Sequence, residues 1–201
     1  MMNINWERNE IALKIVYYGP GLSGKTTNLD YIYRHIDPAH RGEMISLKTM
    51  EERTIFFDFM QIELPPIHGK QPTFSLYTVP GQYYYAASRR IILNGADGIV
   101  FVADSQRRRL NDNLDSMLDL EQNLIQFGRT LAEVPWVLQL NKRDLPDILP
   151  VKALREKLNY HGVPTLEAVA IQGVGVNETL KTVIQQVLIH IERRWHVPAG
   201  Q

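Results

Sequence analysis

Runs of β-branched and aromatic residues alternate along this chain with segments whose apolar residues recur at helical spacing. The alternation predicts strands at 11–18, 54–59, 73–79, 98–103 and 135–140, and a last strand within 163–170. It predicts helices at 25–36, 107–127, 151–159 and 176–194. Strands that alternate with helices form a mainly parallel α/β sheet with helices on both faces, and such a sheet binds ligands beyond the carboxyl ends of its strands.

The composition is that of a soluble globular protein, and its charges balance at 22 Lys and Arg against 22 Asp and Glu. This balance argues against a protein held on nucleic acid or lipid by bulk charge. The chain has no cysteine, which excludes disulfides, thiolate metal sites and prenylation. We expect a cytoplasmic protein without a signal peptide or lipid anchor, with one domain over 1–195 and a short tail at 196–201.

The segment Gly19–Thr26 separates the first predicted strand from the first predicted helix. Its sequence, GPGLSGKT, matches the phosphate-binding pattern G-x-x-x-x-G-K-[ST] in the context that the pattern requires. Glycines let peptide N–H groups converge on phosphate oxygens, Lys25 supplies a cation for the β- and γ-phosphates, and the Thr26 hydroxyl suits Mg²⁺. An ordinary glycine-rich turn is the alternative. The expected phosphate contacts are Gly19, Gly21, Leu22, Ser23, Gly24, Lys25, Thr26 and Thr27.

A second polar motif, Asn141-Lys142-Arg143-Asp144, directly follows the predicted strand at 135–140. A carboxylate only accepts hydrogen bonds, so Asp144 complements the N1–H and exocyclic amino group of guanine, whereas adenine presents an acceptor at N1. The stem of Lys142 can lie on the base, and Asn141 can brace the neighbouring loops. Alone, this short motif also fits a polar loop. Together with the phosphate loop, it predicts a guanine nucleotide.

The segments 19–26, 78–82 and 141–144 resemble the Ras-like small GTPases. The segments 14–22, 53–59 and 101–105 narrow the resemblance to the MglA-type bacterial small GTPases of gliding motility and cell polarity. The resemblance extends over roughly residues 3–192. It implies a P-loop NTPase fold with a six-stranded sheet and five helices, GTP or GDP with Mg²⁺ as ligands, and two loops controlled by the nucleotide.

Thr78 departs from the wider Ras-like pattern D-x-x-G, although it agrees with the MglA type. In the wider family the aspartate holds a Mg²⁺-bound water, and a hydroxyl cannot replace its charge, so another acid is needed. Asp58 is the candidate, because it lies in a predicted strand among three phenylalanines, where an unpaired acid is costly. The alternative places Asp58 on the outward face of a half-buried strand.

Hydrolysis requires a positioned water and neutralised charge at the γ-phosphate. The resemblance places the water-orienting residue at Gln82. The loop glycine, Gly81, lets its N–H approach the γ-phosphate. It assigns Thr54 as the switch threonine that ligates Mg²⁺, whereas Thr49 competes for this role by spacing alone. It also makes Arg53 a built-in arginine finger, against the alternative of a surface arginine paired with a neighbouring glutamate. With Lys25, Gln82 and Arg53 are the expected catalytic residues.

Three further features concern the base and the partners. By resemblance, the backbone N–H of Ala170 is expected to donate to guanine O6. At least one ring of Tyr83–Tyr85 must be exposed, because neighbouring helix positions diverge by about 100°, and exposed rings there suit a protein interface. The run Arg107–Arg109 fits a solvated helix start, with an acidic effector or a lipid surface as alternatives. The resemblance implies a roadblock-fold activating protein of the MglB type and effectors that contact the tyrosines and switch loops.

These features together predict a switch that hydrolyses GTP slowly without a partner and recruits effectors in its GTP state. By resemblance, its output is bacterial polarity or motility, with recruitment to a cell pole by partners. A nucleotide-dependent scaffold that scarcely hydrolyses GTP is the alternative, and Thr78 favours it. A P-loop kinase of small molecules is a further alternative, against which the motif at 141–144 speaks.

Overall fold

The computed structural model describes residues 3–5, 10–47, 57–66, 71–81 and 85–195 of the chain. The strands within these ranges are β1 Asn3–Asn5, β2 Glu10–Tyr18, β3 Ile45–Leu47, β4 Phe57–Glu63, β5 Gln71–Thr78, β6 Gly98–Asp104, β7 Trp136–Asn141 and β8 Thr165–Glu167. The α-helices there are α1 Lys25–His35, α2 Ala86–Leu93, α3 Leu110–Gln126, α4 Val151–Leu158 and α5 Val176–Trp195.

All strands of the described residues belong to one sheet, in the order β3-β4-β5-β2-β6-β7-β8, with β1 paired to β2. Strands β5, β2, β6, β7 and β8 are parallel, whereas β1, β3 and β4 pair antiparallel. The predicted mainly parallel sheet is therefore confirmed. The six strands implied by the resemblance correspond to the segment from β4 to β8 in this order, and the three-residue strands β1 and β3 add to them.

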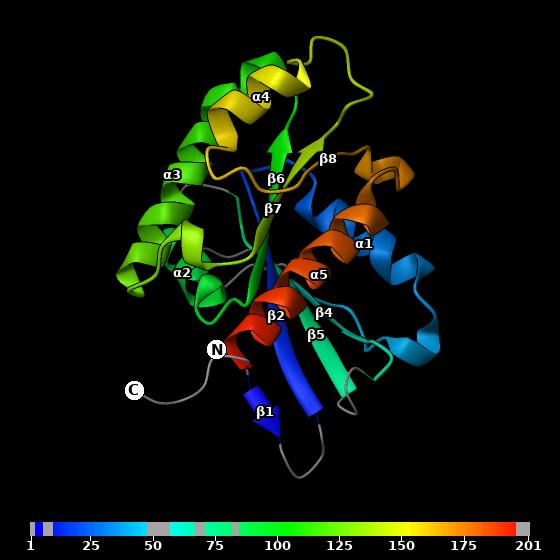
Figure 1. Ribbon diagram of the computed structural model, residues 1–201. Coiled ribbons are helices and arrows are strands. Elements are labelled where there is room, and N and C mark those ends of the chain that lie inside the picture. The colour runs from blue at the N-terminus through cyan, green and yellow to red at the C-terminus, as the bar shows by residue number, and fades with distance from the viewer. Residues whose placement is uncertain (1–2, 6–9, 48–56, 67–70, 82–84, 196–201) are drawn as a thin grey trace.

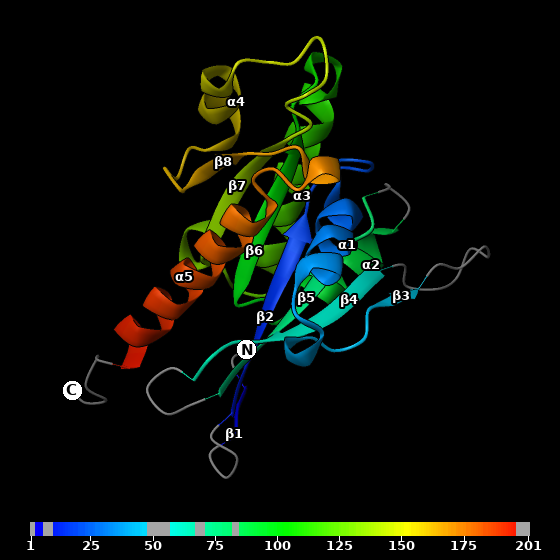
Figure 2. The same ribbon diagram turned by 90° about the vertical axis from the view of Figure 1, so that its right-hand side faces the viewer.

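Helices cover both faces of the sheet, as predicted. Figure 1 shows α2, α3 and α4 on one side of the strands and α1 and α5 on the other, and Figure 2 shows the molecule turned by 90°. A hydrophobic core lies on each face of the sheet, and alternate residues of β2 pack into the two cores. Leu13, Ile15 and Tyr17 face α1 and α5, whereas Val16 and Tyr18 face the helices on the opposite side. Every residue of β6 and β7 is buried, because both faces of these central strands are covered.

Several predicted boundaries were wrong. Strand β4 continues to Glu63 instead of ending at 59, and the segment 163–170 forms a strand over Thr165–Glu167 alone. The predicted helix at 107–127 begins as a 3₁₀ turn, Arg107–Arg109, before α3. The apolar periodicity did not predict helix α2. No helix of the described residues is long and apolar enough to cross a membrane.

Candidate functional site

Loops that follow β2, β5 and β7 come together at the carboxyl ends of these strands. The sheet register pairs Tyr17 with Thr78, and Asp104 with Asn141, so the neighbouring strands end at similar heights. The phosphate-loop segment contacts the loop after β5 through Gly21 and the loop after β7 through Ser23. The two motifs singled out in the sequence therefore share one edge of the sheet.

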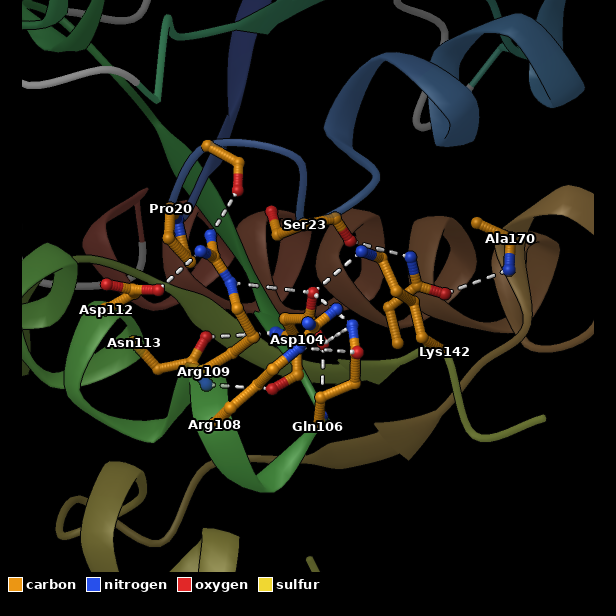
Figure 3. Close-up of polar contacts among 12 residues, drawn as sticks. Pro20, Ser23, Asp104, Gln106, Arg108, Arg109, Asp112, Asn113, Lys142 and Ala170 are labelled. Atoms are coloured by element: carbon orange, nitrogen blue, oxygen red, sulfur yellow. Dashed lines mark hydrogen bonds and ion pairs between the residues drawn. The ribbon is translucent and has the colours of Figure 1, made fainter. Parts of the chain in front are cut away.

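The side chain of Asn141 joins the phosphate loop to the segment around Ala170. Its amide donates to the Ser23 carbonyl at 2.8 Å, and its oxygen accepts from the Ala170 N–H at 2.9 Å. Figure 3 shows Ser23 and Ala170 on either side of this bridge. Gly24 lies against the same amide with a φ of 104°, and a Cβ there would be 2.2 Å from the Asn141 nitrogen. This position therefore requires glycine.

Lys25 lies buried beneath the loop, where its ammonium donates to the carbonyls of Gly19 at 2.8 Å and Pro20 at 2.7 Å. Burial, together with the nearby cations Arg89 and Arg109, lowers the pKa of Lys25 to about 7, although the carboxylate of Asp58 acts in the opposite direction. An anion bound at this loop would stabilise the charged form. The electrostatics of the loop thus favour a negatively charged ligand.

Gly81 packs on the phosphate loop backbone to backbone. A Cβ at Gly81 would lie 2.3 Å from the nitrogen of Gly21 and 2.6 Å from the carbonyl carbon of Pro20. No other residue fits without moving one of the loops. The position of the loop after β5 is consequently coupled to that of the phosphate loop.

Asp58 lies at the hydroxyl of Thr26. Its carboxylate accepts hydrogen bonds from Thr26 Oγ1 at 2.6 Å, Thr78 Oγ1 at 2.9 Å and Ser46 Oγ at 2.6 Å. The Asp58 N–H in turn donates to Thr78 Oγ1 at 2.9 Å. Thr78 therefore holds the Asp58 carboxylate in place by hydrogen bonds, and the carboxylate beside Thr26 belongs to β4, the strand next to β5.

The alternation of β4 explains the orientation of Asp58. Phe57 and Phe59 are half-buried on one face of the strand, whereas Asp58 is 1% exposed and shares the buried face with Met60. The alternative that placed Asp58 on an outward face was wrong. Three hydroxyl donors compensate the cost of burying the carboxylate.

The described residues contain no group of three or more His, Asp or Glu side chains that could hold a metal ion alone. Mg²⁺ does not require such a group, because it takes one or two protein oxygens and completes its shell with water and phosphate oxygens. The adjacent hydroxyl of Thr26 and carboxylate of Asp58 are oxygen donors of this kind. The donor set thus fits Mg²⁺ beside a bound phosphate.

In the motif at 141–144, the ammonium of Lys142 lies 2.7 Å from the carboxylate of Asp104, which is 1% exposed. Asp144 is exposed in the same loop. A pocket of about 320 Å³ opens here, and Figure 3 shows the polar residues that line it. The lining residues are Leu22, Asp104, Gln106, Arg108, Arg109 and Lys142.

The run Arg107–Arg109 is a solvated helix start only in part. Arg107 and Arg108 are exposed, and Arg107 pairs with Asp147 at 3.1 Å. Arg109 instead points to the phosphate loop and donates to the carbonyl of Gly21 at 2.6 Å. The prediction of a purely solvated run was wrong for Arg109.

Several predicted residues lie outside the described part of the chain: Arg53, Thr54, Gln82, Tyr83 and Tyr84, with Thr49 as the competing switch residue. Tyr85 is half-buried at the start of α2, and Thr27 is half-buried in the first turn of α1. The sequence interpretation did not single out Asp104 or Arg109. An acid directly after a fully buried strand was an available signal for Asp104, whereas nothing local distinguishes Arg109 from its neighbours.

The family model described as the ADP-ribosylation factor family matches residues 3–188. The chain belongs to this family of small GTPases. It is 50% identical over 193 residues to the mutual gliding-motility protein MglA of Myxococcus xanthus, covering 96% of this chain and 99% of that protein. The resemblance inferred from the motifs is therefore confirmed.

Eukaryotic GTPases are more distant relatives. The chain is 24% identical over 191 residues to the Ypt/Rab-type GTPase ypt7 of Pyricularia oryzae, with 92% of this chain and 86% of that protein covered. It has the same identity and coverage with the Ypt/Rab-type GTPase Rab7 of Neurospora crassa. The similarity spans nearly the whole chain in each case, so it includes both the phosphate loop and the motif at 141–144.

Proposed function

We propose that this member of the family is a molecular switch that binds GTP or GDP with Mg²⁺ and hydrolyses GTP slowly. The observation that carries the proposal is the bridge of Asn141, which holds the phosphate loop and the Ala170 segment together at one sheet edge. That spacing suits one ligand with phosphates at one end and a base at the other. In this proposal Asp144 accepts from guanine. The Ala170 N–H donates to Asn141 Oδ1 in this structure, so it would serve guanine O6 by sharing its hydrogen with that bond or exchanging it.

The proposed Mg²⁺ ligands are Thr26 and Thr54, with Asp58 acting through a water. The contact between Asp58 and the Thr26 hydroxyl supports this assignment. The ion would neutralise charge on the β- and γ-phosphates. Ser46 and Thr78 would keep the Asp58 carboxylate aimed at that hydroxyl, since both donate to it.

For hydrolysis we assign Gln82 to orient the attacking water and Arg53 to neutralise developing charge, with Lys25 on the β- and γ-phosphates. Gly81 would offer its N–H to the γ-phosphate, and its packing on Gly21 supports a loop that responds to that group. Loss of the γ-phosphate would release the loops of Gly81 and Thr54, which is how such a switch changes its surface.

The name of the Myxococcus xanthus relative suggests a cellular role. We propose that this protein likewise controls motility or polarity from the cytoplasm and is recruited to a cell pole by partners. An activating protein of the roadblock fold, of the MglB type, is the proposed regulator. Effectors would contact Tyr83–Tyr85 and the switch loops in the GTP state.

Nucleotide specificity is tested by titration of fluorescent GDP and ADP analogues in the presence of Mg²⁺. We expect tight binding of the guanine analogue and a loss of at least tenfold in Asp144→Ala. Asp147→Ala is the matched control, because Asp147 is an exposed acid of the same loop that pairs with Arg107. Equal binding of both analogues would overturn the guanine assignment.

A scaffold that holds GTP without hydrolysis is the second candidate, and Thr78 in place of an acid favours it. The position of Asp58 speaks against it, because a carboxylate is present beside Thr26. Single-turnover release of phosphate, with and without a roadblock-fold partner, separates the two. Phosphate release that is slowed at least tenfold in Gln82→Leu supports the switch, whereas no release under either condition supports the scaffold.

A further inference from the structure

Arg109 occupies the last position of the 3₁₀ turn that leads into α3, and its guanidinium crosses to the phosphate loop. One nitrogen, Nη2, donates to the carbonyl of Gly21 at 2.6 Å. Another, Nη1, lies 2.6 Å from the carboxylate of Asp112, and Nε lies 3.9 Å from that of Asp104. Figure 3 shows Arg109 between these two acids. The side chain is thus held from three directions.

The residue after Gly21 has a strained backbone. Leu22 adopts a φ of +64°, in the left-handed region that a side chain with Cβ rarely occupies. Its side chain is 87% exposed, so packing contributes little to holding this conformation. Another interaction must therefore keep the Gly21–Leu22 peptide in place.

The hydrogen bond from Arg109 is one such interaction, beside the bond from the Ser23 N–H to the Pro20 carbonyl at 3.3 Å that closes the same turn. In a planar trans peptide the C=O and the N–H point to opposite sides. Since Arg109 holds the Gly21 carbonyl, the Leu22 N–H is directed to the other side of the peptide, away from the guanidinium. Phosphate loops bind their ligand through such N–H groups, so the orientation of this peptide determines whether one of them is available.

We propose that Arg109 is a positioning residue, which keeps the Gly21–Leu22 peptide in the orientation that binds the phosphates of the nucleotide. This inference rests on the proposed function. The planar fork of arginine can reach a carbonyl and two carboxylates at once, which a lysine ammonium on a flexible stem cannot reproduce.

Asp104 connects Arg109 to the part of the site that would bind the base. It lies 2.7 Å from the ammonium of Lys142 and 3.9 Å from Arg109, and it is nearly inaccessible to water. One buried carboxylate therefore positions a cation of the base loop and the arginine that holds the phosphate loop. The start of α3 becomes part of the nucleotide site through these contacts.

The test measures the rate at which a fluorescent GDP analogue dissociates from the full chain in Mg²⁺. Arg109→Ala should release it about tenfold faster or more, as expected for loss of a charged hydrogen bond. Arg109→Lys should fall between Arg109→Ala and the unaltered protein. Arg107→Ala is the matched control, because Arg107 is exposed and pairs with Asp147; it should stay within about twofold.

Leu22→Gly separates positioning from a simple effect of charge. Glycine adopts positive φ without the strain of leucine, so the loop then depends less on Arg109. In the Leu22→Gly background, Arg109→Ala should accelerate release at least about threefold less than it does with leucine present, because the two residues are coupled. An equal acceleration in both backgrounds would overturn the positioning role and leave a charge effect.

The failures of the two proposals are distinguishable. If the unaltered chain binds no guanine nucleotide, the proposed function and this inference both fall. If it binds GDP and Arg109→Ala releases it at the unaltered rate, the inference alone is overturned. Thermal unfolding of each variant shows whether it is still folded. If Arg109→Ala has lost its fold, Arg109→Lys tests the inference instead, and GDP release from Arg109→Lys at the unaltered rate would overturn it.

Discussion

The carboxylate of Asp58 accepts a hydrogen bond from the hydroxyl of Thr26 at 2.6 Å, across 32 residues of sequence. Thr26 ends the phosphate-loop segment as the second residue of α1, and Asp58 is the second residue of β4. Thr78, at the end of β5, donates to the same carboxylate. The position that carries an acid in the wider Ras-like pattern is therefore a hydroxyl here, and the carboxylate beside Thr26 belongs to the adjacent antiparallel strand β4.

The proposed role of Asp58 predicts a loss of metal dependence. Asp58→Asn keeps the size of the side chain and removes its charge, so GTP affinity measured in Mg²⁺ should fall at least about tenfold, whereas affinity in EDTA should change little. Glu63→Gln is the control, since Glu63 is an exposed acid at the end of the same strand. Equal affinity of Asp58→Asn and the unaltered protein in Mg²⁺ would remove Asp58 from the metal site.

The lowered pKa of Lys25 predicts a pH dependence of stability in the nucleotide-free protein. Between pH 7 and 10.5 the unfolded chain keeps a proton on this lysine that the folded protein has released. The free energy of unfolding therefore rises with pH across this window, by at most about 1.4 kcal/mol per pH unit from this group.

Urea unfolding at pH 7 and pH 9 measures this contribution. The rise should be smaller in Lys25→Met and unchanged in Lys152→Met, because the Lys152 side chain is 89% exposed. Bound GDP should also abolish the rise, since phosphate stabilises the ammonium. An identical rise in Lys25→Met and the unaltered protein would contradict the assignment.

Two consecutive tyrosines of β2 should respond in opposite directions to loss of their hydroxyls. The Tyr17 hydroxyl is buried with no hydrogen-bond partner among the described residues, and burial raises its pKa. The Tyr18 hydroxyl donates to Asp119 and accepts from Asn123 at 3.1 Å. Tyr17→Phe should stabilise the protein by about 1 kcal/mol, and Tyr18→Phe should destabilise it by about 1–2 kcal/mol. Urea denaturation of the two variants measures the change in the free energy of unfolding. Destabilisation by both substitutions would show that the Tyr17 hydroxyl has a hydrogen-bond partner.

The bridge of Asn141 predicts a sharp effect of a nearly isosteric change. Asn141→Asp would place a carboxylate oxygen against the Ser23 carbonyl, which now accepts from the amide at 2.8 Å. Repulsion there should separate the two loops and lower GDP affinity by about a hundredfold, since a buried acceptor loses its donor. Calorimetric titration measures the change. Retained affinity would mean that the loops are held together by other contacts.

Local sequence determined the order of most strands and helices, but not β1, β3 or α2, and it singled out the phosphate-loop pattern and the motif at 141–144. These depend on short-range properties: apolar periodicity, glycines at strained turns, and residues whose chemistry suits phosphate or base. The partner of Thr26 could not be settled in this way, because the exposure of Asp58 depends on which face of β4 meets the sheet's interior. Sequence alternation allowed either answer.

Only the tertiary structure decided which distant side chains complete the site. Arg109 is one of three consecutive arginines with the same local chemistry, and only the folded chain brings it to the Gly21 carbonyl. Asp104 likewise serves Lys142 because β6 and β7 end side by side. Hydrogen bonds between remote residues require that the sheet be assembled first, and their geometry is therefore a property of packing that no local pattern contains.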